Sequence, residues 1–201
     1  MNALQPSRNS LLPSTLLFLL FTVSAAAQQG PIVHQGTTEI GGFIGSSYGL
    51  DSWRVMGGGN VAYAVTRLVM PYAEFSYFPG IQRNASFPSG SVGFSVPVSD
   101  AHAGIHLRMP LGESPIVPYL VAGAGVLRFG DADVKIKFPD GTILSDTIQG
   151  ESNFAANFGG GVRIYTREHV GFRIEAKIYK PTGTYTDPFY KVEGGVFIQF
   201  K

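Results

Sequence analysis

The chain has 201 residues, with 15 Lys and Arg against 14 Asp and Glu and a formal net charge of +1. This balance argues against a nucleic-acid-binding protein, which would carry a basic stripe. The chain contains no cysteine, so an exported domain of this size must fold without disulfides. Its 26 glycines recur inside strand-like segments, where glycine normally destabilises the strand.

The N-terminal segment has the pattern of a secretory signal peptide. Arg8 precedes an apolar run over residues 11–23, and the small residues Ala25, Ala26 and Ala27 follow that run. The run is shorter than the roughly 20 apolar residues that a transmembrane helix needs. We therefore predict a signal peptide over residues 1–27 and one mature domain over residues 28–201.

Eight segments of the mature domain are predicted to be strands, because each is rich in β-branched or aromatic residues with partial two-residue alternation. No segment combines helical periodicity with caps, so the predicted fold class is all-β. Short links around Arg67, Gly112 and Glu168 alternate with mostly longer loops, which are rich in Gly, Pro, Ser, Thr, Asn and Asp and are predicted at 47–53, 79–97, 130–152 and 180–188. Pro139, Asp140 and Gly141 predict a small hairpin within loop 130–152. The predicted strands are 37–46, 54–65, 69–78, 98–109, 118–129, 153–165, 170–179 and 189–200.

Alternation alone does not say which face of a strand is turned inward. In segment 173–180, Arg173, Glu175 and Lys177 lie on one face, and Ile174 and Ile178 lie on the other. A soluble sandwich has the polar face outside, whereas a membrane barrel can have it inside.

Three features favour the membrane barrel. The charges of each strand lie on one face, the strands are longer than the about 5 to 6 residues usual in globular proteins, and aromatic residues lie near both strand ends. Tyr119 with Phe129 and Tyr190 with Phe200 are the predicted interfacial aromatics. The prediction is an eight-stranded antiparallel up-and-down transmembrane β-barrel.

In this barrel the charged faces point into the lumen, because an Arg or Lys facing lipid at the midplane costs about 2–4 kcal/mol. Glu175 is predicted to pair with Arg173 or Arg163, and Glu193 with Lys177 or Lys191. Strand glycines such as Gly41, Gly104, Gly161 and Gly195 would leave room for bulky charged neighbours. The predicted lumen charge network is Glu39, Glu74, Arg108, Arg163, Arg173, Glu175, Lys177, Lys191 and Glu193.

The final strand, from Val192 to Phe200, alternates apolar residues and ends on an aromatic. Together with the signal peptide and the eight predicted strands, it resembles the small eight-stranded outer-membrane barrels of the OmpA and OmpX type. The resemblance implies export through the periplasm to the outer membrane of a Gram-negative-type bacterium, and contact with outer-membrane lipid. It also implies that the outer-membrane assembly machinery recognises Val196, Ile198 and Phe200.

The nearest approach to a metal cluster is Asp100, His102 and His106. Residues four apart on one strand are separated by roughly 13 Å, so the two histidines cannot share an ion without a bend. We predict no metal and no cofactor. Ser91, Ser95 and Ser99 precede His102 without forming the His-x-Ser pair of an outer-membrane deacylase, so we predict no catalytic residue and no enzyme.

The predicted function is that of a non-enzymatic outer-membrane barrel with a charged, side-chain-filled lumen. It would be structural or present its long loops to a surface ligand. The alternatives are a narrow pore for small solutes, a soluble periplasmic barrel that carries a lipid with Ile174 and Ile178 inward, and a lipid-modifying enzyme. Tyr48, Trp53 and Tyr185 are predicted to contact a ligand or to belong to an interfacial girdle.

Overall fold

The computed structural model describes residues 33–49, 52–88, 90–182 and 187–201, so the predicted signal peptide lies outside the described residues. In these ranges no helix is long and apolar enough to cross a membrane. The structure is all-β. Its strands are β1 (Thr38–Gly49), β2 (Ser52–Tyr63), β3 (Val69–Phe87), β4 (Gly90–Arg108), β5 (Ile116–Phe129), β6 (Ala132–Lys137), β7 (Ile143–Ile148), β8 (Ser152–Arg167), β9 (Val170–Pro181) and β10 (Phe189–Phe200).

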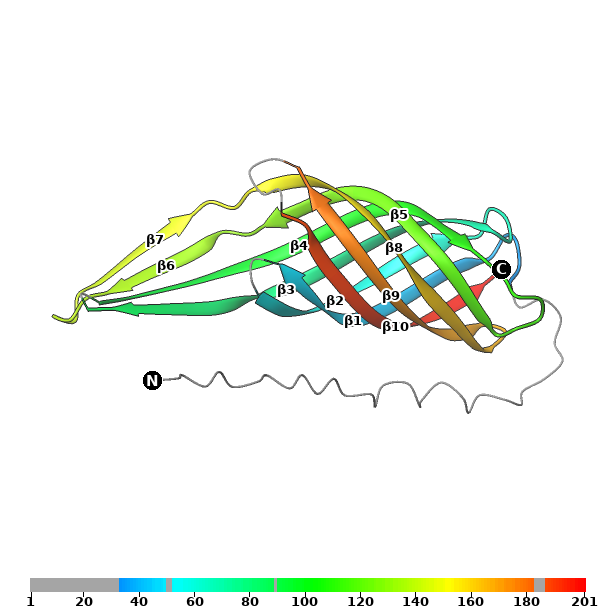
Figure 1. Ribbon diagram of the computed structural model, residues 1–201, viewed down its shortest axis with the longest axis horizontal. Coiled ribbons are helices and arrows are strands. Elements are labelled where there is room, and N and C mark those ends of the chain that lie inside the picture. Colours follow the sequence, from blue (N-terminus) through cyan, green and yellow to red (C-terminus); the bar gives the residue numbers. More distant parts are fainter. Residues whose placement is uncertain (1–32, 50–51, 89, 183–186) are drawn as a thin grey trace, which may run out of the picture.

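Eight of these strands close into an antiparallel barrel (Figure 1). Each strand of the barrel pairs with the next along the chain, except that β5 pairs with β8 because β6 and β7 form a separate hairpin. The first and last strands close the ring, with Thr38 opposite Phe200 and Tyr48 opposite Tyr190. The predicted eight-stranded up-and-down barrel is confirmed.

The two ends of the barrel differ as the loop lengths predicted. Brief links after β2, β4 and β8 lie at one end, called the short-turn end, together with Thr38 and Phe200. In one of these links, the Thr66 hydroxyl accepts hydrogen bonds from the backbone N–H groups of Leu68 and Val69. We call the opposite end the long-loop end.

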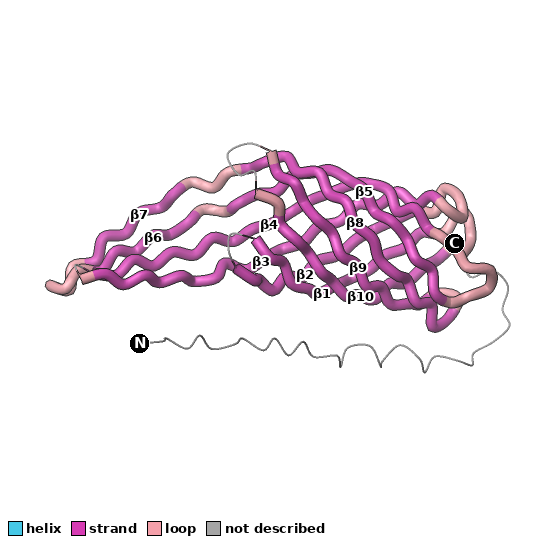
Figure 2. The backbone as a smooth tube through the Cα atoms, viewed as in Figure 1, coloured by secondary structure: helices cyan, strands magenta, loops and turns pink. Residues whose placement is uncertain are grey.

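A four-stranded sheet projects from the long-loop end (Figures 1 and 2). The strands β3 and β4 continue past the barrel to Phe87 and Gly90, and β6 pairs with β4 through Ser91 to Ser95. We call residues 79–87 and 90–97 with β6 and β7 the extension. The prediction of a loop over residues 79–97 is therefore wrong. A register shift between Phe78 and Ile81 carries β3 through the Pro-Gly pair that looked like a strand end.

The hairpin predicted within loop 130–152 is confirmed as β6 and β7. Gly141 at its tip has a φ of 87°, a conformation that glycine adopts at little cost. The backbone N–H of Thr142 donates to the Asp140 carboxylate over 2.9 Å, and this hydrogen bond lowers the pKa of Asp140. The turn residues seen in the sequence thus make a hairpin tip rather than an open loop.

The barrel has a polar interior and an apolar exterior. Strand β9 alternates without a break: Arg173 and Glu175 are each 1% exposed, while Ile174 is 56% and Ile178 48% exposed. The predicted orientation of its faces is confirmed. The alternative of a soluble, lipid-carrying barrel with Ile174 and Ile178 inward is wrong.

Aromatic side chains mark the long-loop end of the outer surface. Tyr48, Trp53 and Tyr190 occupy neighbouring positions on β1, β2 and β10, and the ring centroids of Tyr48 and Trp53 are 5.2 Å apart. All three are exposed, as is Phe200 at the other end. This placement fits the girdle interpretation of Tyr48 and Trp53; Tyr185 lies outside the described residues.

Two of the predicted interfacial aromatics are on the wrong face. Tyr119 is 1% exposed and Phe129 packs against a buried cluster at the long-loop end, so both point inward. Strand β5 carries apolar residues on both faces, with Leu120 and Val126 outward and Val121 inward. Its alternation therefore did not indicate which face was turned to the lumen.

Candidate functional site

The lumen is filled by ionised side chains of both signs. All nine residues of the predicted network are at most 4% exposed, and so is Asp100. Among the described residues, the buried charges are thus five carboxylates and five Lys or Arg side chains. Burying a charge costs several kcal/mol unless it is paired, and an equal number of each sign permits complete pairing.

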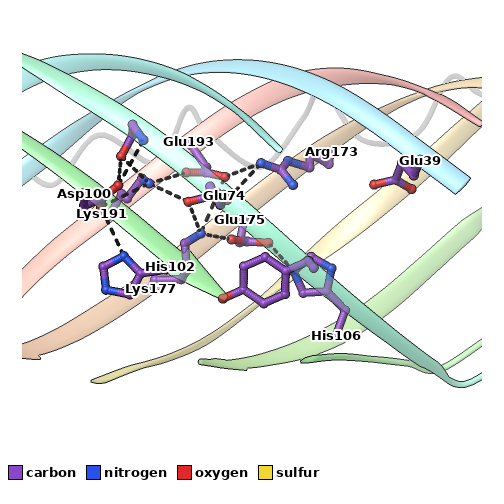
Figure 3. Close-up of polar contacts among 12 residues, drawn as sticks. Glu39, Glu74, Asp100, His102, His106, Arg173, Glu175, Lys177, Lys191 and Glu193 are labelled. Carbon is purple, nitrogen blue, oxygen red and sulfur yellow. Dashed lines mark hydrogen bonds and ion pairs between the residues drawn. The ribbon is translucent and has the colours of Figure 1, made fainter. Parts of the chain in front are cut away.

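Glu74 lies at the centre of the largest group of contacts (Figure 3). Its Oε1 is 2.7 Å from Lys177 Nζ and 2.7 Å from Lys191 Nζ, and its Oε2 is 3.2 Å from Arg173 Nη2. Glu74 comes from β3, whereas Arg173 and Lys177 come from β9 and Lys191 from β10. The contacts therefore cross the lumen and tie opposite walls of the barrel together.

Glu175 and Glu193 complete this central cluster. Glu175 accepts a hydrogen bond from the Tyr119 hydroxyl over 2.5 Å and lies 2.5 Å from Lys177 Nζ. Glu193 lies 2.8 Å from Arg173, 3.3 Å from Lys191 and 3.8 Å from Lys177. Glu193 is thus near both of its predicted partners, whereas Glu175 pairs with Lys177 rather than with Arg173 or Arg163.

Carboxylate oxygens of Glu74, Glu175 and Glu193 lie within 4.8 Å of one another, a spacing that can suit a metal ion. Here the cations of Lys177, Lys191 and Arg173 contact the same carboxylates. A divalent ion would have to displace these cations, so the donor set does not fit a metal site.

A second group of charges lies nearer the short-turn end. Arg163 is 3.1 Å from Glu39 and 2.9 Å from His106 Nδ1, and its guanidinium lies 4.2 Å from the centre of the Tyr119 ring. The His106 ring stacks on Tyr72 with centroids 4.2 Å apart. Arg108, at the end of β4, donates to the backbone oxygen of Thr66 over 2.9 Å.

The two histidines considered as metal ligands belong to different groups. His106 contacts Arg163 and Glu175, whereas His102 Nδ1 is 3.9 Å from Asp100 Oδ2. Asp100 also lies 3.7 Å from Lys191 and accepts a hydrogen bond from Ser76. The structure therefore places Asp100 in the lumen network, although the predicted network did not include it.

The position of Asp100 was recoverable from the sequence, because it is two residues from His102 on a strand whose polar face was assigned to the lumen. The position of Tyr119 was not, since no charge on the inward face of β5 indicates its direction. Ser91, Ser95 and Ser99 lie on the other face of β4 from His102. This geometry separates them from the histidine that catalysis would require.

Apolar clusters lie on both sides of the central charges. One cluster, at the long-loop end, contains Phe43, Met56, Phe78, Val98, Leu127 and Ala155. The Phe43 ring centre is 5.0 Å from the Arg173 guanidinium and 4.8 Å from Lys191 Nζ. The other clusters contain Ala62, Met70, Tyr72, Tyr119 and Val121, and Val33, Val117, Tyr165 and Phe197.

Strand glycines leave room for the backbone of the adjacent strand and for uncharged side chains, several of them aromatic, rather than for charged side chains. A Cβ at Gly161 would lie 2.7 Å from the Tyr119 hydroxyl oxygen, and one at Gly104 would lie 2.8 Å from a Tyr72 ring carbon. The neighbours of Gly195 and Gly41 include Phe43 and Asn60, respectively. The prediction that these glycines make room in the lumen holds, but not the prediction that their neighbours are charged.

The predicted assembly residues lie on the outward face of the closing strand. Val196 is 52%, Ile198 56% and Phe200 44% exposed. Strand β10 pairs with β1 along Thr38 to Tyr48 and with β9. The strand that would be recognised during assembly is therefore also the strand that closes the ring.

No family model matches the chain, and no curated protein matches it. It is similar to the solved structure of Ail from Yersinia pestis in complex with the heparin analogue sucrose octasulfate. The identity is 17%, with 83% of this chain and 99% of that chain covered and a TM-score of 0.51. The N-terminal barrel domain of Pseudomonas aeruginosa OprF has 16% identity, with 83% and 98% covered and a TM-score of 0.49. Pseudomonas aeruginosa OprG has 14% identity, with 85% and 99% covered and a TM-score of 0.45. The similarity to Ail concerns the fold, and the chain has the fold of the small eight-stranded transmembrane β-barrels.

Proposed function

We propose that the chain is a non-enzymatic outer-membrane barrel that anchors the extension and presents it to partners outside the cell. The observation that carries this proposal is a reversal of polarity along the strands. On the barrel side of this reversal, the outward face of β5 carries Leu120 and Val126. On the extension side, the outward face of β6 carries Lys135 and Lys137, which are exposed. The outer surface thus changes from one suited to lipid to one suited to water.

The inward face reverses in the opposite sense. Within the barrel it carries the ion-pair network, whereas in the extension it carries Val92, Val96, Val134, Ile136 and Leu144, as the register of β4, β6 and β7 shows. A strand that lay in one environment over its whole length would have no reason to exchange its faces. The exchange supports a membrane boundary at the base of the extension.

The long-loop end would face outward, as in other outer-membrane barrels, and the short-turn end would face the periplasm. The apolar outward faces would contact outer-membrane lipid. The outer-membrane assembly machinery would recognise Val196, Ile198 and Phe200 on the closing strand.

The lumen supports a structural role better than the alternative of a narrow pore. Among the described residues its charges are equal in number and all except Arg108 form ion pairs with one another, and the apolar cluster around Phe43 and Leu127 lies above them at the long-loop end. An ion entering this lumen would have to displace the paired charges. We propose that the network stabilises the closed barrel that supports the extension.

A peptide tag at each end of the barrel tests this orientation. One tag is inserted at Gly141, at the tip of the β6–β7 hairpin, and a matched tag at Gly112, in a short turn; both glycines have positive φ. Antibody is expected to label intact cells through the Gly141 tag, and to reach the Gly112 tag only after permeabilisation. Labelling of the Gly112 tag alone in intact cells would mean that the orientation is the reverse of the proposed one. If neither tag is detected by antibody in the membrane fraction, the proposed location is refuted.

Presentation to partners is tested separately. Cells expressing the intact barrel are compared, for attachment to other cells and to surfaces, with cells expressing a barrel that lacks β6 and β7. Attachment is expected to fall when the hairpin is absent. If the two kinds of cell attach equally well at equal surface abundance of the two barrels, the proposed presenting role is refuted.

A further inference from the structure

A small apolar cup opens at the long-loop end of the barrel, beside the base of the extension. It encloses a cavity of about 50 Å³, and its lining includes Phe78, Val98, Leu127, Phe129, Pro181 and Phe189. These residues come from β3, β4, β5, β9 and β10. The cup therefore lies across the mouth of the barrel and not in the wall between two strands.

The cup is closed from below. Phe43 and Met56 belong to the same apolar cluster as the lining residues Phe78, Val98 and Leu127. Lys191, part of the central ion-pair network, lies 4.8 Å from the centre of the Phe43 ring. A molecule that enters the cup meets a packed layer and then paired charges. The geometry suits binding from the outside and does not suit passage through the barrel.

The charges of the cup balance. Its lining contains one cation, Arg54, and one carboxylate, Asp187. Arg54 already donates a hydrogen bond to the backbone oxygen of Val96 over 3.3 Å. An ionised ligand would gain no net attraction here and would lose hydration among the aromatic side chains, so a neutral ligand fits best.

The inward face of the extension continues the apolar surface beyond the cup. Val96 lies next to Val98 on the same face of β4, on the side of the extension. Ala132, the first residue of β6, comes shortly after Phe129 in the sequence. Farther out on this face, Leu144 is 56% and Ile148 is 60% exposed. Among the residues that β6 and β7 place on this face there is one charge, Asp146. An elongated apolar molecule can therefore lie on the extension while one end enters the cup.

The size of the cup limits what can enter it. A cavity needs about 10–15 Å³ on this measure to hold one water molecule, so about 50 Å³ holds a few methylene groups at the end of an alkyl chain rather than a whole bulky ligand. We propose that the cup and the inward face of the extension bind a neutral molecule with a linear alkyl chain, the chain end lying between Val98, Leu127 and Phe129. This site goes beyond the proposed presenting role and does not depend on it.

The test uses the folded full-length barrel in nanodiscs of deuterated lipid, with 1-octanol as the probe. Octanol is expected to shift the methyl NMR signals of Val98 and Leu127 in a saturable way. The lipid-facing methyls of Val126 should shift linearly with the octanol that partitions into the lipid. 1-Butanol, whose chain is too short to reach from the cup onto the extension, is expected to bind at least tenfold more weakly.

Two variants separate a specific site from partitioning. Ser47→Phe fills the cup from β1 and is expected to weaken octanol binding at least tenfold, whereas Val126→Phe on the lipid face should leave it unchanged. Phe129→Ala enlarges the cup and is expected to strengthen binding of longer alcohols, which keeps the test decisive if Ser47→Phe misfolds. The site is refuted if Val98 and Leu127 shift linearly together with Val126, or if neither shifts.

Discussion

Glu39 and Arg163 show what a single buried charge contributes to the barrel. Their side chains are fully buried and 3.1 Å apart, and among the described residues Glu39 is the carboxylate that pairs with Arg163. In Glu39→Gln the guanidinium remains buried without its counter-charge, beside the ring of His106. We expect the free energy of unfolding to fall by about 3–5 kcal/mol, measured by urea titration of the barrel folded in lipid vesicles.

Two further variants control this prediction. Lys137→Met, on the exposed face of β6, should change stability by no more than about 0.5 kcal/mol. The double variant Glu39→Gln with Arg163→Met removes both charges and should recover part of the loss, because no buried charge is left unpaired. If Glu39→Gln behaves like Lys137→Met, the pair does not stabilise the barrel.

Gly161 tests the interpretation of the strand glycines. In Gly161→Ala the new Cβ would clash with the backbone oxygen of Ile174 and lie 2.7 Å from the Tyr119 hydroxyl oxygen, which donates to Glu175. Relieving these two contacts should cost about 1–3 kcal/mol of stability, again measured by urea titration. Gly42→Ala is the matched control, since its Cβ would have one neighbour, a backbone oxygen at 3.9 Å. Equal effects of the two substitutions would mean that Tyr119 does not require the glycine.

At the scale of strands, the sequence predicted most reliably where charge and apolar residues alternate. In β9 the charges of Arg173, Glu175 and Lys177 fix the inward face, and the structure has the same orientation. In β5 both faces are apolar, so the inward direction of Tyr119 depends on the closure of the barrel and on its contact with Glu175. Contacts between distant strands of this kind leave no local pattern in the sequence.

The extension was missed for a related reason. The criterion for a strand end was a cluster of Gly, Pro, Ser and Asn, and residues 79–97 contain such a cluster. In the structure a register shift carries β3 past this cluster, and pairing with β4 continues to Phe87 and Gly90. The third strand of the sheet, β6, comes from a loop more than 30 residues farther along the chain and pairs at Ser91 to Ser95. Such pairing is not visible in a local window of sequence.

The pairing pattern predicts that the barrel folds without the β6–β7 hairpin. These strands pair with each other and with the part of β4 outside the barrel, while Phe129 and Glu151 already hydrogen-bond to each other at the base of the hairpin. A chain in which residues 130–150 are replaced by Asn-Gly should still close, because this dipeptide favours a two-residue hairpin turn and would directly join the hydrogen-bonded residues Phe129 and Glu151. The expected result is an unboiled band that migrates differently from the boiled band on a detergent gel. Loss of that difference would mean that the hairpin is needed for closure.

At the scale of the whole molecule, the exchange of faces predicts where the membrane ends. On the outward surface, Val126 near the end of β5 is 47% exposed, and the charged Arg128 follows it two residues later. The lipid boundary should therefore lie between these two positions on β5, with Lys135 of the extension well clear of it. The paired charges of the lumen do not affect this assignment, since they face away from lipid.

Nitroxide labels can locate this boundary, because the chain has no cysteine and single substitutions give single labels. In lipid vesicles, a label at Val126→Cys should be accessible to oxygen and shielded from a water-soluble nickel chelate, whereas a label at Lys135→Cys should show the opposite. A label at Leu144→Cys, on the inward face of the extension, should also be reached by the chelate, since that face is apolar but lies outside the membrane. If the label at position 135 proved as oxygen-accessible and nickel-shielded as the one at position 126, the extension would lie in lipid. The exchange of faces would then need a cause other than the membrane boundary.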